Sequence, residues 1–247
     1  RFHPSTNRSA SIGGFVAGGS AGVGSIRWAG LRAFGNILAL KIVTCEETPR
    51  VLDLVGKDIL KVAHAYGTNG IIVEVEMPLT QSHDWIDVMV GFDDYIDACR
   101  FAEAVGLQDG LLVKEVGACA APIPETYFTR HKTYVRPGQS VVLLMVAPVS
   151  IDPMLVFIDH HAGEVLYRSD TASDEERKRL PPIYELTWNH TTLRALKIDS
   201  TITYLQTRYP SLDHIKTIMD ILGDELPMHV EVARQDGKVA FAGLPMV

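Results

Sequence analysis

A dense cluster of glycines near the start of the chain is the feature that most constrains its fold. Seven glycines fall between Gly13 and Gly30. Glycine loses more backbone freedom on folding than any other residue, so a cluster is favoured where the backbone must approach another object closely. A flat cofactor with a pyrophosphate is one such object, and a purely structural loop is the other. The residues alone leave both interpretations open.

The cluster matches neither common nucleotide-binding fingerprint. A dinucleotide-binding loop needs GxGxxG, and the third glycine is missing after Gly22 and Gly24. Gly19 and Gly24 have the spacing of a GxxxxGK[ST] loop, but Ser25 stands where that loop needs lysine. Ordinary phosphate-loop chemistry is therefore disfavoured.

Composition narrows the class of protein. The chain has 247 residues, enough for one large domain or two small ones, and 47% of them are hydrophobic. A net charge of -7 argues against nucleic acid as a partner, because that requires a basic surface. The longest apolar run, 140–149, is the length of a strand, so no membrane partner is expected. The first residue is not Met, and we expect a piece of a longer protein.

Cysteine usage predicts the compartment. Cys45, Cys99 and Cys119 are odd in number, far apart in the sequence, and form no CxxC pair. They indicate reduced thiols in a cytoplasmic protein, each acting as a small core residue.

The order of predicted strands and helices changes along the chain. This change predicts two domains, 1–80 and 85–247, joined by a polar linker. The first has a glycine loop, strands at 36–44, 50–54 and 70–79, and a helix at 58–65. The second repeats strand, helix and strand, which predicts an α+β layer of ferredoxin-like type with helices on one sheet face. The elements expected there are strands at 85–91, 111–116, 141–148, 164–168, 202–207, 228–234 and 238–242, and helices at 93–105, 152–161, 173–180, 184–196 and 212–222.

Two segments carry a resemblance to a known family. The segment 11–30, SIGGFVAGGSAGVGSIRWAG, resembles the T-I-G-G-x-x-A-x-x-x-G-G … S-x-R-Y-G segment of FAD-binding oxidases of the vanillyl-alcohol oxidase / p-cresol methylhydroxylase type. The segment 66–75, YGTNGIIVEV, resembles that family's G-x-x-G-I-I-T-E-V strand. The likeness is strong over 9–80 and weak over 85–247. It implies the C-terminal half of the FAD-binding domain followed by an α+β cap domain for substrate.

The resemblance also implies which residues approach FAD. The backbone of the glycine segment would meet the pyrophosphate, ribityl chain and ring, because glycine N–H groups can form anion-binding concavities. Serine hydroxyls can add donors. The implied cofactor-binding residues are Gly13, Gly14, Gly18, Gly19, Ser20, Gly22, Gly24, Ser25, Gly70, Ile71 and Ile72. The family's first FAD subdomain, with its Arg-Gly-Gly-Gly-Thr-like loop, has no counterpart here, so FAD binding by this chain alone is expected to be weak or absent.

The candidate catalytic residues lie in one cap segment, Trp188-Asn189-His190-Thr191-Thr192-Leu193-Arg194. His190 and Arg194 are spaced i and i+4, so on a helix they share a face. Such a pair suits a substrate that is a carboxylate or forms an alkoxide, with His190 as base and Arg194 as anion clamp. Trp188 and Asn189 are the candidate substrate contacts. The alternative is that Trp188 packs in the core and His190 has a structural hydrogen bond.

A metal site is disfavoured. His229 and Glu231 would share one face of a strand, but the second histidine found in related 2-hydroxy-acid dehydrogenases does not follow at its spacing. The charge run at 174–179 predicts a solvated helix.

Two functions from different classes remain open. The first is an FAD-dependent oxidoreductase, or a fragment of one, that transfers a hydride from an alcohol or hydroxy acid to the flavin. The second is a non-catalytic α+β module for assembly or small-ligand binding without FAD. A small molecule is the expected partner, and a homo-oligomer is an open option.

Overall fold

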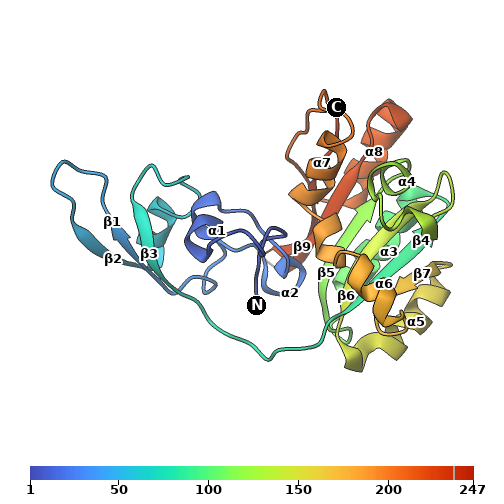
Figure 1. The fold of residues 1–247 in the computed structure, drawn as a ribbon, viewed down its shortest axis with the longest axis horizontal. Coiled ribbons are helices and arrows are strands. Elements are labelled where there is room, and N and C mark those ends of the chain that lie inside the picture. The colour runs from blue at the N-terminus through green and yellow to red at the C-terminus, as the bar shows by residue number, and fades with distance from the viewer. Residues whose placement is uncertain (236) are drawn as a thin grey trace. The chain divides into compact units, whose positions relative to one another are not determined.

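The computed structural model describes residues 1–235 and 237–247, and the chain divides into two compact units (Figure 1). Unit 1 is Arg1–Ser82 and unit 2 is His83–Val247. Both combine helices with antiparallel strands, so the predicted mixed α+β class is confirmed. Along the described residues, no helix is both long enough and apolar enough to cross a membrane.

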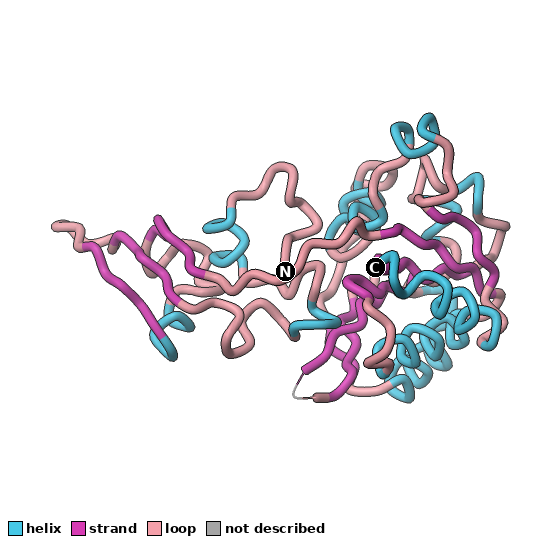
Figure 2. The backbone as a smooth tube through the Cα atoms, turned by 90° about the horizontal axis from the view of Figure 1, so that it is seen from below, coloured by secondary structure: helices cyan, strands magenta, loops and turns pink. Residues whose placement is uncertain are grey.

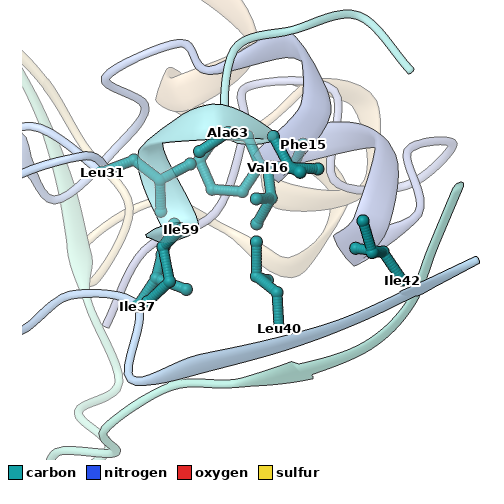
Figure 3. Close-up of a cluster of buried hydrophobic side chains, with 9 residues drawn as sticks. Phe15, Val16, Leu31, Ile37, Leu40, Ile42, Ile59 and Ala63 are labelled. Atoms are coloured by element: carbon teal, nitrogen blue, oxygen red, sulfur yellow. The ribbon is translucent and has the colours of Figure 1, made fainter. Parts of the chain in front are cut away.

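Unit 1 is built on a three-stranded antiparallel sheet in the order β2-β1-β3. Its elements are α1 (Ile12–Gly18), α2 (Ser25–Trp28), β1 (Ala39–Val43), β2 (Val51–Val55), the 3-10 helix η1 (Gly56–Lys61) and β3 (Ile71–Glu76). Alternate β1 residues Leu40 and Ile42 point to one face of the sheet and are buried. They pack with Phe15 and Val16 of α1 and Ile59 of η1 in the core that Figure 3 shows.

The glycine segment begins with a helix, and the predicted continuous loop is wrong for 12–18. The Ser11 side chain accepts a hydrogen bond from the Gly14 N–H at 3.0 Å and caps the helix start. Gly19 ends the helix with φ 66°, a left-handed conformation that glycine adopts without strain. Burial of Phe15 and Val16 overcomes the low helix propensity of the glycines.

Unit 2 is built on a seven-stranded antiparallel sheet in the order β7-β4-β6-β5-β9-β10-β8. Its strands are β4 (Ile86–Phe92), β5 (Val113–Cys119), β6 (Ser140–Val146), β7 (Glu164–Arg168), β8 (Thr207–Tyr209), β9 (His229–Gln235) and β10 (Lys238–Gly243). Its helices are α3 (Tyr95–Leu107), α4 (Ile123–Tyr127), α5 (Ile151–His160), α6 (Asp174–Arg179), α7 (Asn189–Leu196) and α8 (Leu212–Leu222). Short 3-10 helices are η2 (Lys132–Tyr134), η3 (Pro148–Ser150), η4 (Ile183–Leu186) and η5 (Gly223–Glu225).

Both faces of this sheet are covered, whereas the sequence predicts helices on one face only. Arg234 of β9 donates to the Gly106 carbonyl of α3, so α3 lies on the Arg234 face. Glu231 points to the opposite face, because strand side chains alternate, and accepts from the Trp188 N–H at the start of α7. All seven residues of β6 are accordingly buried. Figure 2 shows helices on both sides of the strands.

Three predicted elements differ from the structure. The helix predicted at 58–65 is replaced by the 3-10 helix η1, and the strand predicted at 202–207 shares only Thr207 with β8. The helix predicted at 184–196 is two helices, η4 and α7, because Trp188 between them has φ 51°. The charged helix α6 is confirmed, with a Ser173–Glu176 capping box. The turn predicted around 236–237 falls partly on Asp236, which lies outside the described residues.

The cysteines follow the prediction in part. Cys99 and Cys119 are buried free thiols. Cys45 is also a free thiol but is exposed, because it follows the end of β1 rather than lying within the sheet. The expectation of a core position is therefore wrong for Cys45.

Candidate functional site

The two segments that carry the family resemblance lie against each other in unit 1. The N–H groups of His64 and Tyr66 donate to the carbonyls of Val16 and Ala17 in α1, both at 3.0 Å. A Cβ added to Gly13 would lie 3.3 Å from the Ile72 carbonyl oxygen of β3. Helix α1 and strand β3 are thus brought together, as a shared site for one ligand requires.

Four of the residues predicted to bind FAD are buried in unit 1. They are Gly22, Gly24, Ser25 and Gly70. Their surroundings explain the glycines by contacts within the chain. A Cβ on Gly22 would lie 2.6 Å from Phe15 Cζ, and one on Gly70 would lie 2.9 Å from Ile42 Cδ1. The Ser25 hydroxyl donates to the Gly22 carbonyl at 2.6 Å. These four residues are therefore enclosed by other parts of unit 1.

The other predicted FAD contacts reach the surface of unit 1. Gly14, Ser20 and Ile71 are exposed, and Gly13, Gly18, Gly19 and Ile72 are partly exposed. A Cβ on Gly18 would meet no atom within 4 Å, so its backbone is open to approach. Gly19 differs, because a Cβ there would lie 2.2 Å from the His64 Cβ. Of the predicted contacts, Gly14, Gly18 and Ser20 are the positions best placed to meet a ligand.

The predicted catalytic pair lies on α7 in unit 2. His190 is partly buried, and burial, followed by the charge of Arg194, lowers its pKa, so the neutral imidazole is favoured. Its Nδ1 atom is buried without a hydrogen-bond partner. Arg194 donates from Nε to the Glu185 carbonyl at 2.8 Å and lies 3.6 Å from the Glu185 carboxylate. Asn189 is exposed and Trp188 is partly buried.

A buried polar network beneath the start of α7 is the main feature that sequence reasoning did not find. His229 Nε2 lies 2.5 Å from Glu231 Oε1, and the Trp188 N–H donates to the same oxygen at 2.6 Å. The shared strand face predicted for His229 and Glu231 is confirmed. Glu115 of β5 lies within hydrogen-bonding reach of Glu231. The only sequence signal was the i, i+2 spacing of His229 and Glu231 on β9.

The network is electrostatically unusual because it is fully removed from water. Burial raises the pKa of Glu115, and the neighbouring Glu231 raises it further. Burial also raises the pKa of Glu231, and interactions with Glu115 and with the Trp188 N–H offset part of that rise. Burial lowers the pKa of His229 to about 3. These directions favour a protonated Glu115, a Glu231 that accepts, and a neutral His229.

The ligand-type side chains of this network do not form a metal site. Among the described residues, no group of three or more His, Cys, Asp and Glu side chains could hold a metal ion.

Comparisons with known proteins assign the fold. No family model matches the chain, and no curated protein sequence matches it. Solved structures do match, and they show that the chain has the fold of FAD-linked oxidases of the p-cresol methylhydroxylase type. Sequence identity is only 12–13%, so the likeness concerns the fold.

Three structures illustrate the match. Two are crystal forms of alkyldihydroxyacetonephosphate synthase, with TM-scores of 0.63 and 0.60, identities of 13% and 12%, and 99% of this chain covered. The third is a 4-ethylphenol oxidase from Gulosibacter chungangensis in complex with isoeugenol, with a TM-score of 0.59, 12% identity and 96% coverage. The match covers 52%, 50% and 55% of those chains, so this chain spans about half their length.

Proposed function

We propose that the chain is part of an FAD-dependent oxidoreductase that transfers a hydride from an alcohol or hydroxy acid to flavin. The observation that carries the proposal is the fold, which matches two different FAD-linked oxidases over 96–99% of this chain. FAD would supply the hydride acceptor. Because the chain spans about half of each neighbour, the activity is proposed for the whole protein to which it belongs.

Unit 1 is the proposed cofactor-binding unit. Gly14 and Gly18 would let the FAD phosphates approach the backbone closely, and the Ser20 hydroxyl would add a donor, since these positions are open at the surface. The exposed Ile71 side chain of β3 would offer an apolar contact. The buried Gly22 and the other buried members of the set would hold this backbone in place. The residues present therefore fit one side of a flavin site.

Unit 2 is the proposed substrate-binding unit, in which α7 supplies the functional side chains. A neutral His190 can accept a proton from a substrate hydroxyl, which favours hydride loss from the adjacent carbon. Arg194 would hold a substrate carboxylate and share its charge with Glu185. Trp188 and Asn189 would line the same site. The proposed substrate is a small molecule, and the proposed location of the enzyme is the cytoplasm.

The first test is whether the natural full-length product carries flavin. The expected result is a yellow protein that releases FAD on denaturation. A colourless protein that takes up no added FAD would instead favour the non-catalytic module.

The second test addresses His190. His190→Ala in the flavin-loaded protein should slow anaerobic flavin reduction by about 10²–10⁴-fold, the usual contribution of a general base. His160→Ala, at an exposed histidine of α5, is the matched control and should leave the rate unchanged. An unchanged rate in His190→Ala would show that the base assignment is wrong.

A further inference from the structure

Two acidic side chains and a histidine are buried together on one face of the seven-stranded sheet. On β5, Glu115, Gly117 and Cys119 alternate onto the same face. The antiparallel register pairs Gly117 with Glu231 and Cys119 with His229. Glu115 is 2% exposed, and His229 and Glu231 are 0% exposed. Burying a carboxyl group without partners has a large desolvation cost, so the hydrogen bonds of Glu231 must offset that cost.

The sheet makes room for the Glu231 carboxyl group at one position. A Cβ on Gly117 would lie 2.7 Å from Glu231 Oε2, too close for any other residue type without movement. Gly117 has no positive φ, so its small size rather than its backbone conformation is what the site uses. The carboxyl group therefore lies flat against the β5 backbone and faces the start of α7.

Glu231 Oε1 accepts two hydrogen bonds that point to its function. One comes from the backbone N–H of Trp188 at 2.6 Å. The other joins His229 Nε2 at 2.5 Å, and because this oxygen already accepts from Trp188, we assign the His229 proton to Nε2. Trp188 itself has φ 51° and ψ -141°, a conformation that is strained for a non-glycine residue. The contact with Glu231 stabilises that strained residue.

Trp188 lies between η4, which ends at Leu186, and α7, which begins at Asn189. The conformation of Trp188 separates η4 from α7. If Trp188 were free to change conformation, the direction in which α7 leaves this point would no longer be defined. Helix α7 carries His190 and Arg194, two and six residues further on. The position of both side chains thus depends on a carboxyl group that lies on another element.

We propose that Glu231 is a positioning residue that anchors the Trp188 backbone and so sets the start of α7, with His229 as its hydrogen-bonding partner. The titratable groups that face Glu231 are Glu115 and Cys119 from β5 and His229 from β9. Only the consequence for catalysis rests on the proposed function, because the anchoring itself is a property of unit 2.

The test compares Glu231→Ala with Glu231→Gln in the whole chain, without flavin or substrate. Glutamine keeps an oxygen that can accept from Trp188, whereas alanine keeps none. Amide hydrogen exchange of 187–196 should be about 10–100-fold faster in Glu231→Ala than in the wild type, as expected for loss of a hydrogen bond to a charged group. Glu231→Gln should restore protection. Glu175→Ala, at an exposed acid of α6, is the matched control and should change nothing.

A pH profile supplies a readout that a merely structural role would not move. The Trp188 amide resonance should shift with pH in the wild type, and the part of that shift that comes from Glu231 should be missing in Glu231→Gln, which cannot titrate at that position. This comparison holds even where Glu231→Ala fails to fold. Unchanged exchange of 187–196 in Glu231→Ala, or the same Trp188 profile in the wild type and Glu231→Gln, would overturn the proposal. Neither readout needs FAD, so failure here is distinct from failure of the proposed function.

Discussion

Two neighbouring glycines should respond oppositely to the same substitution. Gly18 is the last residue of α1 and a Cβ there meets nothing within 4 Å. Gly18→Ala should therefore stabilise unit 1 by about 0.5–1 kcal/mol through helix propensity and reduced freedom of the unfolded chain. Gly19 has φ 66°, and its added Cβ would lie 2.2 Å from the His64 Cβ and 2.8 Å from its Cα.

Gly19→Ala should be strongly destabilising for two reasons. The left-handed conformation costs alanine about 1–2 kcal/mol. The contact with the His64 backbone adds about 1–3 kcal/mol, because that backbone is tied to α1 by the hydrogen bond from His64 N–H to the Val16 carbonyl at 3.0 Å. The sum is about 2–5 kcal/mol. For a domain of this size each kcal/mol lowers the Tm by about 4–8 °C.

The assay is thermal unfolding of the flavin-free chain, followed by hydrogen exchange of peptides from 1–82 so that unit 1 is monitored separately. Gly18→Ala should raise the Tm of unit 1 by a few degrees, and Gly19→Ala should lower it by at least about 10 °C. If both variants had the wild-type Tm, the packing account of the glycine segment would be refuted. Glycine at 19 would then serve only the approach of a ligand.

Three further predictions concern two buried sites of unit 2 and the three cysteines. Burial raises the pKa of Asp87 to about 6, so the folded state holds a proton that the unfolded state releases, and stability should fall by about 2–3 kcal/mol as pH rises from 4 to 6. Asp87→Asn should remove this slope in pH-dependent urea denaturation, and an unchanged slope would contradict it. Gly117→Ala should destabilise by about 1–3 kcal/mol, but less when combined with Glu231→Ala, and purely additive effects would count against the contact. In the folded chain a thiol reagent should label Cys45 alone, and labelling of the two buried cysteines before unfolding would be inconsistent with the structure.

Long elements with a strong apolar pattern were predictable from the sequence. The helix predicted at 212–222 coincides with α8, and the strand predicted at 141–148 overlaps β6. In both, hydrophobic burial and local preference point to the same structure. The resemblance in 11–30 likewise led to the fold that the matching solved structures have.

Other features depend on contacts that a local pattern does not contain. Helix α1 forms despite its glycines because Phe15 and Val16 are buried against η1 and β1. Residue 188 breaks a helical pattern because Glu231, distant in sequence, holds its N–H. The Glu115–Glu231 pair exists only because β5 and β9 become neighbours in the sheet. No spacing rule within either strand predicts that pairing.

We propose that the glycine segment and β3 form one side of a flavin site. The most direct measurement is hydrogen exchange of the full-length protein with and without FAD, read out peptide by peptide. FAD should slow exchange in 11–25 and 70–72, with the largest effect at the open positions Gly14, Gly18 and Ser20. Binding of FAD with no change in exchange across these segments would contradict the claim.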